Sequence, residues 1–392
     1  MRPSPLGNMP VDTFLSEYWQ KKPLLIRNGF PDITSPVNAE VLAGLACEEH
    51  IESRLIIQHE MKNEWELKHG PFSEDTFSTL PKSCWTLLVQ AVDHWIPEAA
   101  KFLDHFTFIP RWRIDDLMIS YASDGGGVGP HFDNYDVFLV QTCGKRKWEV
   151  GSLCDENSPL RESMPVKILD EFEVHYSWIL EPGDILYVPP GISHNGIAIG
   201  DDCITCSVGF RAPSHSEILR EYTDYISEKL NESIRYEDPD LITQSNSGEI
   251  STQAIDKIQN ILQKYIENED LVSDWFARYI STPKYIDEQL APQLESEYLF
   301  TINNLKKYLD EGKIILKNES SRFAYQTSNK QNILYVDGEC FSDTSCDNNL
   351  IATLCNKLEF DNNNIKQSEN NLRLLIELLQ KGSLYLLEGK VL

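Results

Sequence analysis

The sequence contains no apolar segment long enough to cross a membrane. A membrane-spanning helix needs about 20 predominantly apolar residues, and no run in the 392-residue chain approaches that length. The first residues, MRPSPLGNMPVDTF, also lack the apolar core of a secretory signal. We therefore expect a cytoplasmic protein without a membrane-spanning segment.

The cysteines do not form the pattern of a disulfide framework. The chain has nine, an odd number, scattered over its length, which fits a reducing compartment better than an oxidising one. The one CxxC motif, Cys203 to Cys206, lies in a strand-like run. Positions i and i+3 of a strand face opposite sides, so we expect ordinary buried cysteines there and no shared metal ion.

Positive charge is scarce relative to negative charge. The chain has 35 Lys and Arg against 61 Asp and Glu, which gives a net charge of −26 at pH 7. Nucleic acids and anionic membranes are bound through clustered Lys and Arg, so neither is expected as a direct partner. The acidic excess favours a basic protein partner, although solubility alone would also explain it.

The composition changes along the chain in a way that predicts three parts. From about 113 to 212, short β-prone runs alternate with Gly, Pro and Asp turns, a pattern typical of an all-β barrel or sandwich. We assign residues 1–213 to a catalytic domain built on this barrel. Residues 214–281 carry two amphipathic helical stripes around a polar loop. Because so few helices form only a small core, we predict a dimerisation segment there.

Residues 282–392 predict a winged-helix-like domain. The apolar runs KIILK and NILYVDG indicate a small hairpin, and helices are expected near 297–310, 349–358 and 369–381. Such a domain could recognise nucleic acid, but its basic and acidic residues are nearly balanced, which favours a scaffold or protein-contact role. The predicted fold class is therefore α+β, a β barrel followed by a helical segment and a winged-helix-like domain.

A glycine-rich turn leads into the first candidate metal ligands. Residues 125–127 are three glycines, which let the backbone turn tightly before it enters a strand. His131 and Asp133 are two positions apart, so in a strand they share one face and could bind one metal ion. An HxD pair often occurs by chance, and alone it would also fit an ordinary His and Asp at a strand start.

A second histidine strengthens the metal-site hypothesis. The run EPGDILYVPPGISH, residues 181–194, predicts a buried strand between two rigid turns that ends at His194. Two neutral imidazoles and one carboxylate form the facial triad of non-haem Fe(II) oxygenases, which leaves positions open for a cosubstrate and O₂. His175 is a rival third ligand, but no turns flank it.

Arg146 is the candidate anion-binding residue. In the run KRKWEV, strand alternation places Arg146 on the same inward side as Trp148 and Val150. A buried arginine needs an anionic partner, and its guanidinium can bind a carboxylate through two hydrogen bonds. The sequence leaves two partners open, a bound carboxylate and an internal ion pair with one of the many acidic residues.

Together these motifs resemble the JmjC branch of the cupin-type 2-oxoglutarate oxygenases. The similar features are HFD at 131–133, the EPGDILYVPPGISH run, and a basic residue 15 positions after the first histidine. Over residues 10–213 the chain resembles the bacterial ribosomal oxygenases more closely. The segments that carry this resemblance include FLSEYWQKKPLLIRNGF, GGGVGPHFDNYDVFLVQ, GKRKWEVG and SVGFRAP.

The resemblance implies a double-stranded β-helix barrel, Fe(II) bound by His131, Asp133 and His194, and 2-oxoglutarate held at its far carboxylate by Arg146. It implies O₂ as the oxidant and hydroxylation at C3 of an arginine in a large-subunit ribosomal protein. It also implies a cytoplasmic homodimer that acts on a basic ribosomal protein. Alternatives are hydroxylation of a histidine, demethylation of an N-methylated side chain, and a non-catalytic metal-binding cupin.

An arginyl substrate would need carboxylates or aromatic rings near the iron. Asp124, Tyr135 and Asp136 flank the metal-binding strand and are candidates, although Asp136 has the opposite parity and fits a surface position equally well. Ser120 and Asn195 could contact the cosubstrate or could be ordinary strand and turn residues. The sequence also leaves the metal open, since the same ligands bind other divalent ions.

Overall fold

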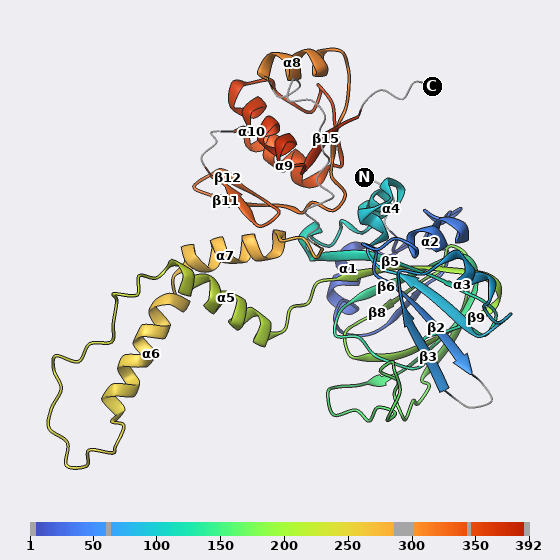
Figure 1. Cartoon of the computed structure of the whole chain (residues 1–392), viewed down its shortest axis with the longest axis horizontal. Helices are drawn as coiled ribbons and strands as arrows, with labels where there is room; N and C mark the ends of the chain where they lie inside the picture. Colours follow the sequence, from blue (N-terminus) through green and yellow to red (C-terminus); the bar gives the residue numbers. More distant parts are fainter. Residues whose placement is uncertain (1–4, 60–63, 286–300, 343–345, 388–392) are drawn as a thin grey trace. The chain divides into compact units, whose positions relative to one another are not determined.

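The computed structural model divides the chain into two compact units, one formed mainly by Met1–Ala212 and the other beginning at Pro213 (Figure 1). The residues it describes are 5–59, 64–285, 301–342 and 346–387. Within these ranges no helix is both long and apolar enough to span a membrane.

A nine-stranded sheet forms the first unit. Its strands follow the order β1-β8-β6-β9-β5-β4-β2-β3, and β7 pairs with β6. The strands are β1 Leu24–Ile26, β2 Ser53–His59, β3 Glu64–His69, β4 Trp85–Val89, β5 Ile114–Ala122, β6 Val137–Leu153, β7 Tyr176–Leu180, β8 Ile185–Val188 and β9 Ile192–Phe210. Every pair is antiparallel, so the predicted β barrel is confirmed.

Strands β6 and β9 are long enough to run through both halves of the barrel. They have 17 and 19 residues, and their pairing shifts register between Gln141 and Lys145. Gly144 has a φ of 63° and Gly200 a φ of 73°, which favours glycine at both positions. The first half of β6 pairs with β8 and the second half with β7. Each long strand thus takes part in both halves of the single barrel sheet.

Helices cover the outer face of this sheet and share an aromatic core with it (Figure 1). They are α1 Val11–Glu17, α2 Ala39–Leu45, α3 Glu74–Ser78 and α4 Pro97–Leu103. Phe14 of α1 is completely buried, and its ring centroid lies 5.5 Å from that of Phe138 and 5.0 Å from that of Tyr187. Burial of each such side chain stabilises the fold by about 1.5–3 kcal/mol.

Asp136 is the centre of a buried polar cluster in this core. Its carboxylate accepts hydrogen bonds from the Tyr187 hydroxyl at 2.6 Å and the Gln20 amide at 2.9 Å. Arg113 Nη2 lies 3.5 Å from the same carboxylate. Burial raises the pKa of Asp136, and the three partners oppose that shift. Both sequence-based interpretations of Asp136, a substrate contact and a surface residue, are therefore wrong, because the side chain is completely buried.

We expect Asp136→Ala to lower the free energy of unfolding by about 3–5 kcal/mol, because Arg113 and Tyr187 lose their buried acceptor. Urea denaturation followed by circular dichroism measures the change. Glu162→Ala, which removes an exposed carboxylate from the same unit, is the control. A loss below about 1 kcal/mol in Asp136→Ala would show that the cluster contributes no more than an ordinary surface contact.

Three helices begin the second unit. They are α5 His215–Lys229, α6 Thr252–Ile266 and α7 Glu269–Ser281. The side chains of Ser214, Ser251 and Asn268 cap their first turns by accepting backbone hydrogen bonds. Asp274 of α7 accepts a hydrogen bond from Tyr225 of α5, which joins these two helices. The two amphipathic stripes predicted in this segment correspond to α5 and α6.

Among the described residues from 301 onwards, this unit contains three helices and two three-stranded sheets. The elements are α8 Ile302–Asp310, β10 Ile315–Lys317, β11 Phe323–Ser328, β12 Gln331–Val336, β13 Glu339–Phe341, α9 Asn348–Asn356, β14 Glu359–Phe360, α10 Glu369–Gln380 and β15 Leu384–Leu386. One sheet has the order β14-β10-β15 and the other β11-β12-β13. The core of this part is mainly aliphatic, with Leu305, Leu350 and Leu375 among its buried residues, and it also includes Phe323 and Phe360.

The predicted hairpin between KIILK and NILYVDG is wrong. These runs form β10 and β12, which belong to different sheets. The hairpin partner of β12 is β11, whose sequence FAYQTS is too polar to predict a buried strand. The expected helix near 297–310 is described from Ile302 to Asp310, and its residues 297–300 lie outside the described part of the chain.

Candidate metal centre

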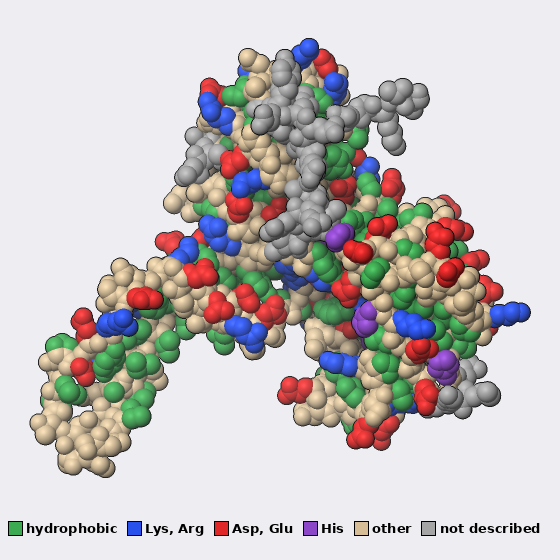
Figure 2. Space-filling model, viewed as in Figure 1, with side chains coloured by type: hydrophobic (Ala, Val, Ile, Leu, Met, Phe, Trp, Pro, Cys, Tyr) green, Lys and Arg blue, Asp and Glu red, His purple; other side chains and the backbone are tan. Residues whose placement is uncertain are grey.

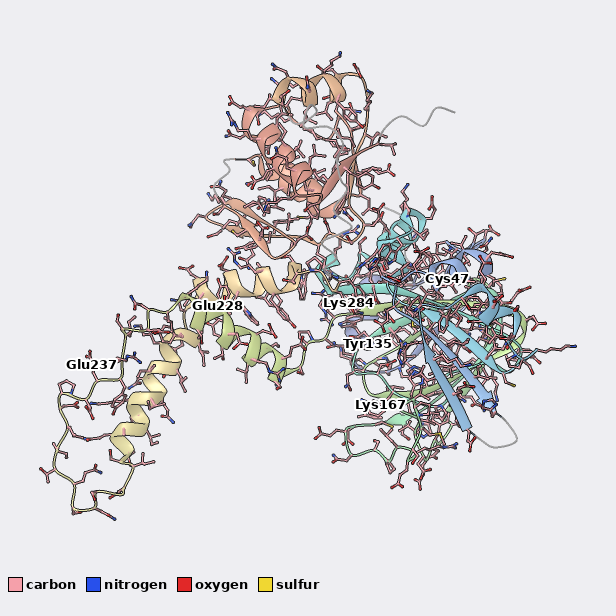
Figure 3. All side chains as sticks on the ribbon, viewed as in Figure 1. Cys47, Tyr135, Lys167, Glu228, Glu237 and Lys284 are labelled. Carbon is pink, nitrogen blue, oxygen red and sulfur yellow. The ribbon has the colours of Figure 1, made fainter. Side chains whose placement is uncertain are left out.

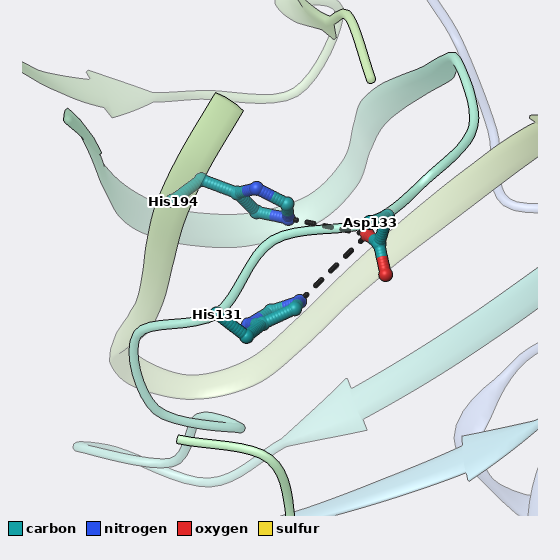
Figure 4. Close-up of side chains that lie close together, drawn as sticks. All are labelled: His131, Asp133 and His194. Atoms are coloured by element: carbon teal, nitrogen blue, oxygen red, sulfur yellow. Dashed lines mark ion pairs between the residues drawn. The ribbon is translucent and has the colours of Figure 1, made fainter. Parts of the chain in front are cut away.

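The barrel brings together all three predicted metal ligands, His131, Asp133 and His194 (Figure 4). One potential ligand atom from each lies within 4.8 Å of the other two. Asp133 Oδ2 is 3.9 Å from His131 Nε2 and 3.6 Å from His194 Nε2. Two imidazole nitrogens and a carboxylate oxygen that converge in this way form the donor set of a non-haem iron site.

Backbone pairing fixes the positions of these residues. His131 and His194 exchange two hydrogen bonds, of 3.0 and 2.8 Å, in an isolated antiparallel bridge. The Gly191 N–H donates to the carbonyl of Asp133 at 2.7 Å, and Gly191 has a φ of 77°. The rigid turn predicted before His194 therefore also holds the segment that carries Asp133.

The glycines before His131 are required by close backbone contacts. A Cβ atom at Gly126 would lie 2.2 Å from the carbonyl oxygen of Trp85, and one at Gly127 would lie 2.4 Å from that of Gly196. Any larger residue would push the segment away from β4 or β9. The triple glycine thus lets the chain pass between two strands on its way to the metal ligands.

The Nδ1 atoms of both histidines lie within hydrogen-bond distance of backbone carbonyl oxygens. Nδ1 of His131 lies 2.8 Å from the carbonyl oxygen of Gly129, and Nδ1 of His194 lies 3.0 Å from that of Ile192. These contacts orient each Nε2 towards Asp133, as hydrogen bonds to the other ring nitrogen do for metal-binding histidines. Burial, together with the neighbouring His131, lowers the pKa of His194. His194 is therefore neutral at pH 7, which is the form that binds a metal ion.

The rival and secondary candidates lie elsewhere. His175 is exposed and lies 3.8 Å from Glu173, and it is not part of the three-residue cluster. Asn195 donates to Glu149 at 3.2 Å, and strand alternation directs it away from the side of His194. Ser120 is buried in β5. These positions give no support to a metal-binding role for His175 or a cosubstrate contact for Asn195.

Arg146 is buried in the barrel with only 3% of its surface exposed. Within the described part of the chain, its Nε and Nη2 atoms have no hydrogen-bond partner. A buried charged group without partners is strongly unfavourable, so the position suits a guanidinium that receives an anion. The planar donors match a carboxylate, and this observation favours a bound carboxylate over an internal ion pair.

Two further candidates lie on the metal-binding segment. Tyr135, labelled in Figure 3, is 43% exposed. Burial of its hydroxyl, together with the nearby carboxylates of Asp133 and Asp116, raises its pKa. Asp124 is exposed and accepts a hydrogen bond from the Gly200 N–H at 2.7 Å. Tyr135 therefore lies beside a metal ligand, whereas Asp124 lies at Gly200, six positions along β9 from His194 and about 20 Å away. The predicted substrate contact of Asp124 thus has no support from its position.

No motif in the sequence predicts a role for the loop between β6 and β7. Its Leu169 N–H donates to the carbonyl of Pro130 at 2.8 Å, and Ile168 packs within 3.2 Å of the Cβ position of Gly129. The loop therefore supports the turn that precedes His131. Such support depends on tertiary contacts, which a single sequence does not reveal.

Comparison with known proteins identifies the family. A JmjC domain is recognised at residues 101–218, and a ROXA-like winged helix at residues 260–385. The ribosomal protein uL16 3-hydroxylase of Escherichia coli is 38% identical over 275 residues, covering 69% of this chain and 71% of that protein. The chain belongs to the ribosomal oxygenase family. The probable ribosomal oxygenase of Haemophilus influenzae is 32% identical over 341 residues, covering 84% of this chain and 81% of that protein.

Solved structures of the ribosomal oxygenase YcfD from E. coli share the fold of this ribosomal oxygenase. One has a TM-score of 0.87 and 30% identity, covering 97% of this chain and 98% of that one. A complex of YcfD with cobalt and 2-oxoglutarate has a TM-score of 0.85. The predicted α+β fold class and the predicted enzyme class, a 2-oxoglutarate-dependent dioxygenase, are confirmed.

Proposed function

We propose that this ribosomal oxygenase hydroxylates an arginine at C3 in a large-subunit ribosomal protein. In this proposal His131, Asp133 and His194 hold Fe(II), and Arg146 holds the far carboxylate of 2-oxoglutarate. One observation carries it: His194 of the cluster lies on β9, which pairs with the strand β6 that carries the buried Arg146. The Nε and Nη2 atoms of Arg146 have no hydrogen-bond partner among the described residues. The E. coli relative named for hydroxylation of uL16 supports a ribosomal protein as substrate.

The residues present fit the groups that the proposal requires. When bound, Fe(II), 2-oxoglutarate and O₂ together supply the oxidising chemistry. The two imidazoles and the Asp133 carboxylate would hold the metal ion, as three protein ligands do in non-haem iron sites. Arg146 would bind the far carboxylate of 2-oxoglutarate and so orient it. The protein's own contribution would therefore be binding and orientation.

The charge of the chain agrees with a basic substrate. A net charge of −26 attracts strongly basic proteins and speeds their encounter with the enzyme. Tyr135 is the proposed contact for the cationic side chain, because an aromatic ring favours a guanidinium and the Tyr135 hydroxyl lies near Asp133. Ribosomal proteins also suggest the cytoplasm as the site of action.

A mass measurement tests the proposed reaction. The purified chain, Fe(II), 2-oxoglutarate and a recombinant uL16-type ribosomal protein should give succinate and a substrate that has gained one oxygen atom. Fragmentation should place this oxygen at C3 of an arginine, and a reaction without 2-oxoglutarate is the control. Oxygen on a histidine, or loss of a methylene unit, would instead identify one of the alternative oxygenase activities. Absence of succinate with every substrate would identify a non-catalytic cupin.

We also propose that residues 214–281 are a dimerisation segment through which two copies of the chain associate. In the sequence this segment follows the catalytic domain at 1–213 and precedes the C-terminal domain at 282–392. Figure 2 shows hydrophobic side chains gathered along α6. Five of them are between 40% and 58% exposed: Ile255, Ile258, Ile261, Leu262 and Ile266. Monomers rarely expose so continuous an apolar face, and a second copy would cover it with the same face.

Ile258→Asp combined with Ile261→Asp should convert the dimer to a monomer, because the charges would be buried in the contact. Sedimentation velocity at several protein concentrations measures the state. Asn260→Asp adds a charge on the opposite side of the same helix and should leave the dimer intact. A wild-type chain that sediments as a monomer at all concentrations would contradict the proposal.

A further inference from the structure

Trp148 lies across the strand pair that carries Arg146 and His194. In the β6–β9 register Trp148 is directly opposite Gly196. A Cβ atom at Gly196 would lie 2.6 Å from Cη2, 2.7 Å from Cζ3 and 2.9 Å from Cζ2 of the Trp148 indole. The far ring of the indole therefore occupies the space that any side chain at position 196 would need.

The indole borders both functional groups of the proposed site. The Arg146 Cζ atom lies 5.8 Å from the ring centroid of Trp148, and the His194 ring centroid lies 5.8 Å from it as well. Arg146 and Trp148 are two positions apart on β6, so they share one face of the strand. The indole thus stands between the proposed carboxylate clamp and a proposed metal ligand.

The Trp148 N–H is buried without a partner. The side chain is 5% exposed, and Nε1 forms no hydrogen bond with any described residue. Buried tryptophans usually satisfy this donor, as buried polar groups do in general. The same holds for Nε and Nη2 of Arg146. Neighbouring unpaired donors on one strand face point to one shared acceptor.

We propose that Trp148 is a second cosubstrate-binding residue, whose Nε1–H donates to the carboxylate held by Arg146 and whose ring orientation is set by Gly196. The inference rests on the proposed function, because it takes 2-oxoglutarate as the acceptor. It assigns Gly196 the specific role of leaving room for a flat indole beneath the cosubstrate.

Calorimetric titration of 2-oxoglutarate into the full-length, Mn(II)-loaded protein tests the inference without turnover. Trp148→Phe keeps a buried aromatic ring but removes the N–H, and we expect about tenfold weaker binding of 2-oxoglutarate, as for one lost hydrogen bond to a charged group. Binding of Mn(II) should be unchanged, because no metal ligand is altered. Trp178→Phe changes the tryptophan paired with Trp148 on β7 and should leave both affinities unchanged.

Gly196→Ala is the second variant in this calorimetric test. Its methyl group displaces the indole, so we expect weaker binding of 2-oxoglutarate in the wild-type background. Trp148→Phe lacks the far ring atoms of the indole, so adding Gly196→Ala to this variant should have little further effect on 2-oxoglutarate binding. The double-mutant cycle should therefore show strong coupling between positions 148 and 196. Unchanged binding in Trp148→Phe, with normal binding in the wild type, would overturn the inference. Failure of the wild type itself to bind 2-oxoglutarate would instead overturn the proposed function.

Discussion

Asp133→Ala is expected to abolish succinate formation and to weaken metal binding by at least about 100-fold, more than the loss of an outer-shell partner does. Asp133 supplies the carboxylate of the three-residue cluster, and its Oδ2 lies within 3.9 Å of both imidazole Nε2 atoms. Without it, two imidazole nitrogens remain to hold a divalent cation. Titration with Mn(II) measures the affinity, and succinate release measures turnover.

His175→Ala is the matched control for this prediction. It removes a histidine that was the rival ligand on sequence grounds but is exposed and lies outside the cluster. We expect its metal affinity and turnover to equal those of the wild type. His131→Ala should behave like Asp133→Ala, because it removes another member of the cluster. If the His131→Ala, Asp133→Ala double variant kept its turnover, the metal-site assignment would be wrong.

The metal ligands could be predicted because local signals specify their placement. The HxD spacing predicts that His131 and Asp133 share one face of a strand. In the structure the pair lies before β6, and only His131 forms a strand bridge. The turns around β8 lead into β9, which begins two residues before His194. Both signals depend on residues close in sequence, and backbone bonds between the two segments then bring them together. The parity of Arg146 likewise predicts its burial, which the structure shows.

The sequence-based predictions were wrong where tertiary contacts override the local residue pattern. Asp136 follows the segment that carries His131 and Asp133, but Tyr187, Gln20 and Arg113 from distant segments hold its carboxylate in the core. The polar strand β11 forms because β12 pairs with it, since strand propensity is strongly context-dependent. The unpaired N–H of Trp148 is also invisible in sequence, because it depends on what surrounds the indole.

Arg146→Met should show whether Arg146 binds 2-oxoglutarate or stabilises the fold. We expect 2-oxoglutarate binding to weaken by about 30-fold or more, the loss expected when a buried charge pair loses one partner. Metal binding should be unchanged, because Arg146 is not in the three-residue cluster. Lys147→Met is the matched control, since Lys147 is the next residue on β6, is 40% exposed in its side chain, and pairs with Glu149. Calorimetry with Mn(II)-loaded protein measures both affinities.

The stability of the same variant, measured without 2-oxoglutarate, discriminates between the two partners that the sequence left open for Arg146. If the guanidinium is kept for a bound anion, its unpaired Nε and Nη2 atoms destabilise the ligand-free fold. Arg146→Met should then raise the free energy of unfolding by about 1–3 kcal/mol, because it removes buried unsatisfied donors. An internal ion pair predicts the opposite sign, since methionine would leave a carboxylate buried alone. We therefore expect Arg146→Met to melt at a higher temperature than the wild type when 2-oxoglutarate is absent. Adding 2-oxoglutarate should raise the melting temperature of the wild type but not that of the variant. This combination would show that Arg146 binds the ligand at the expense of stability.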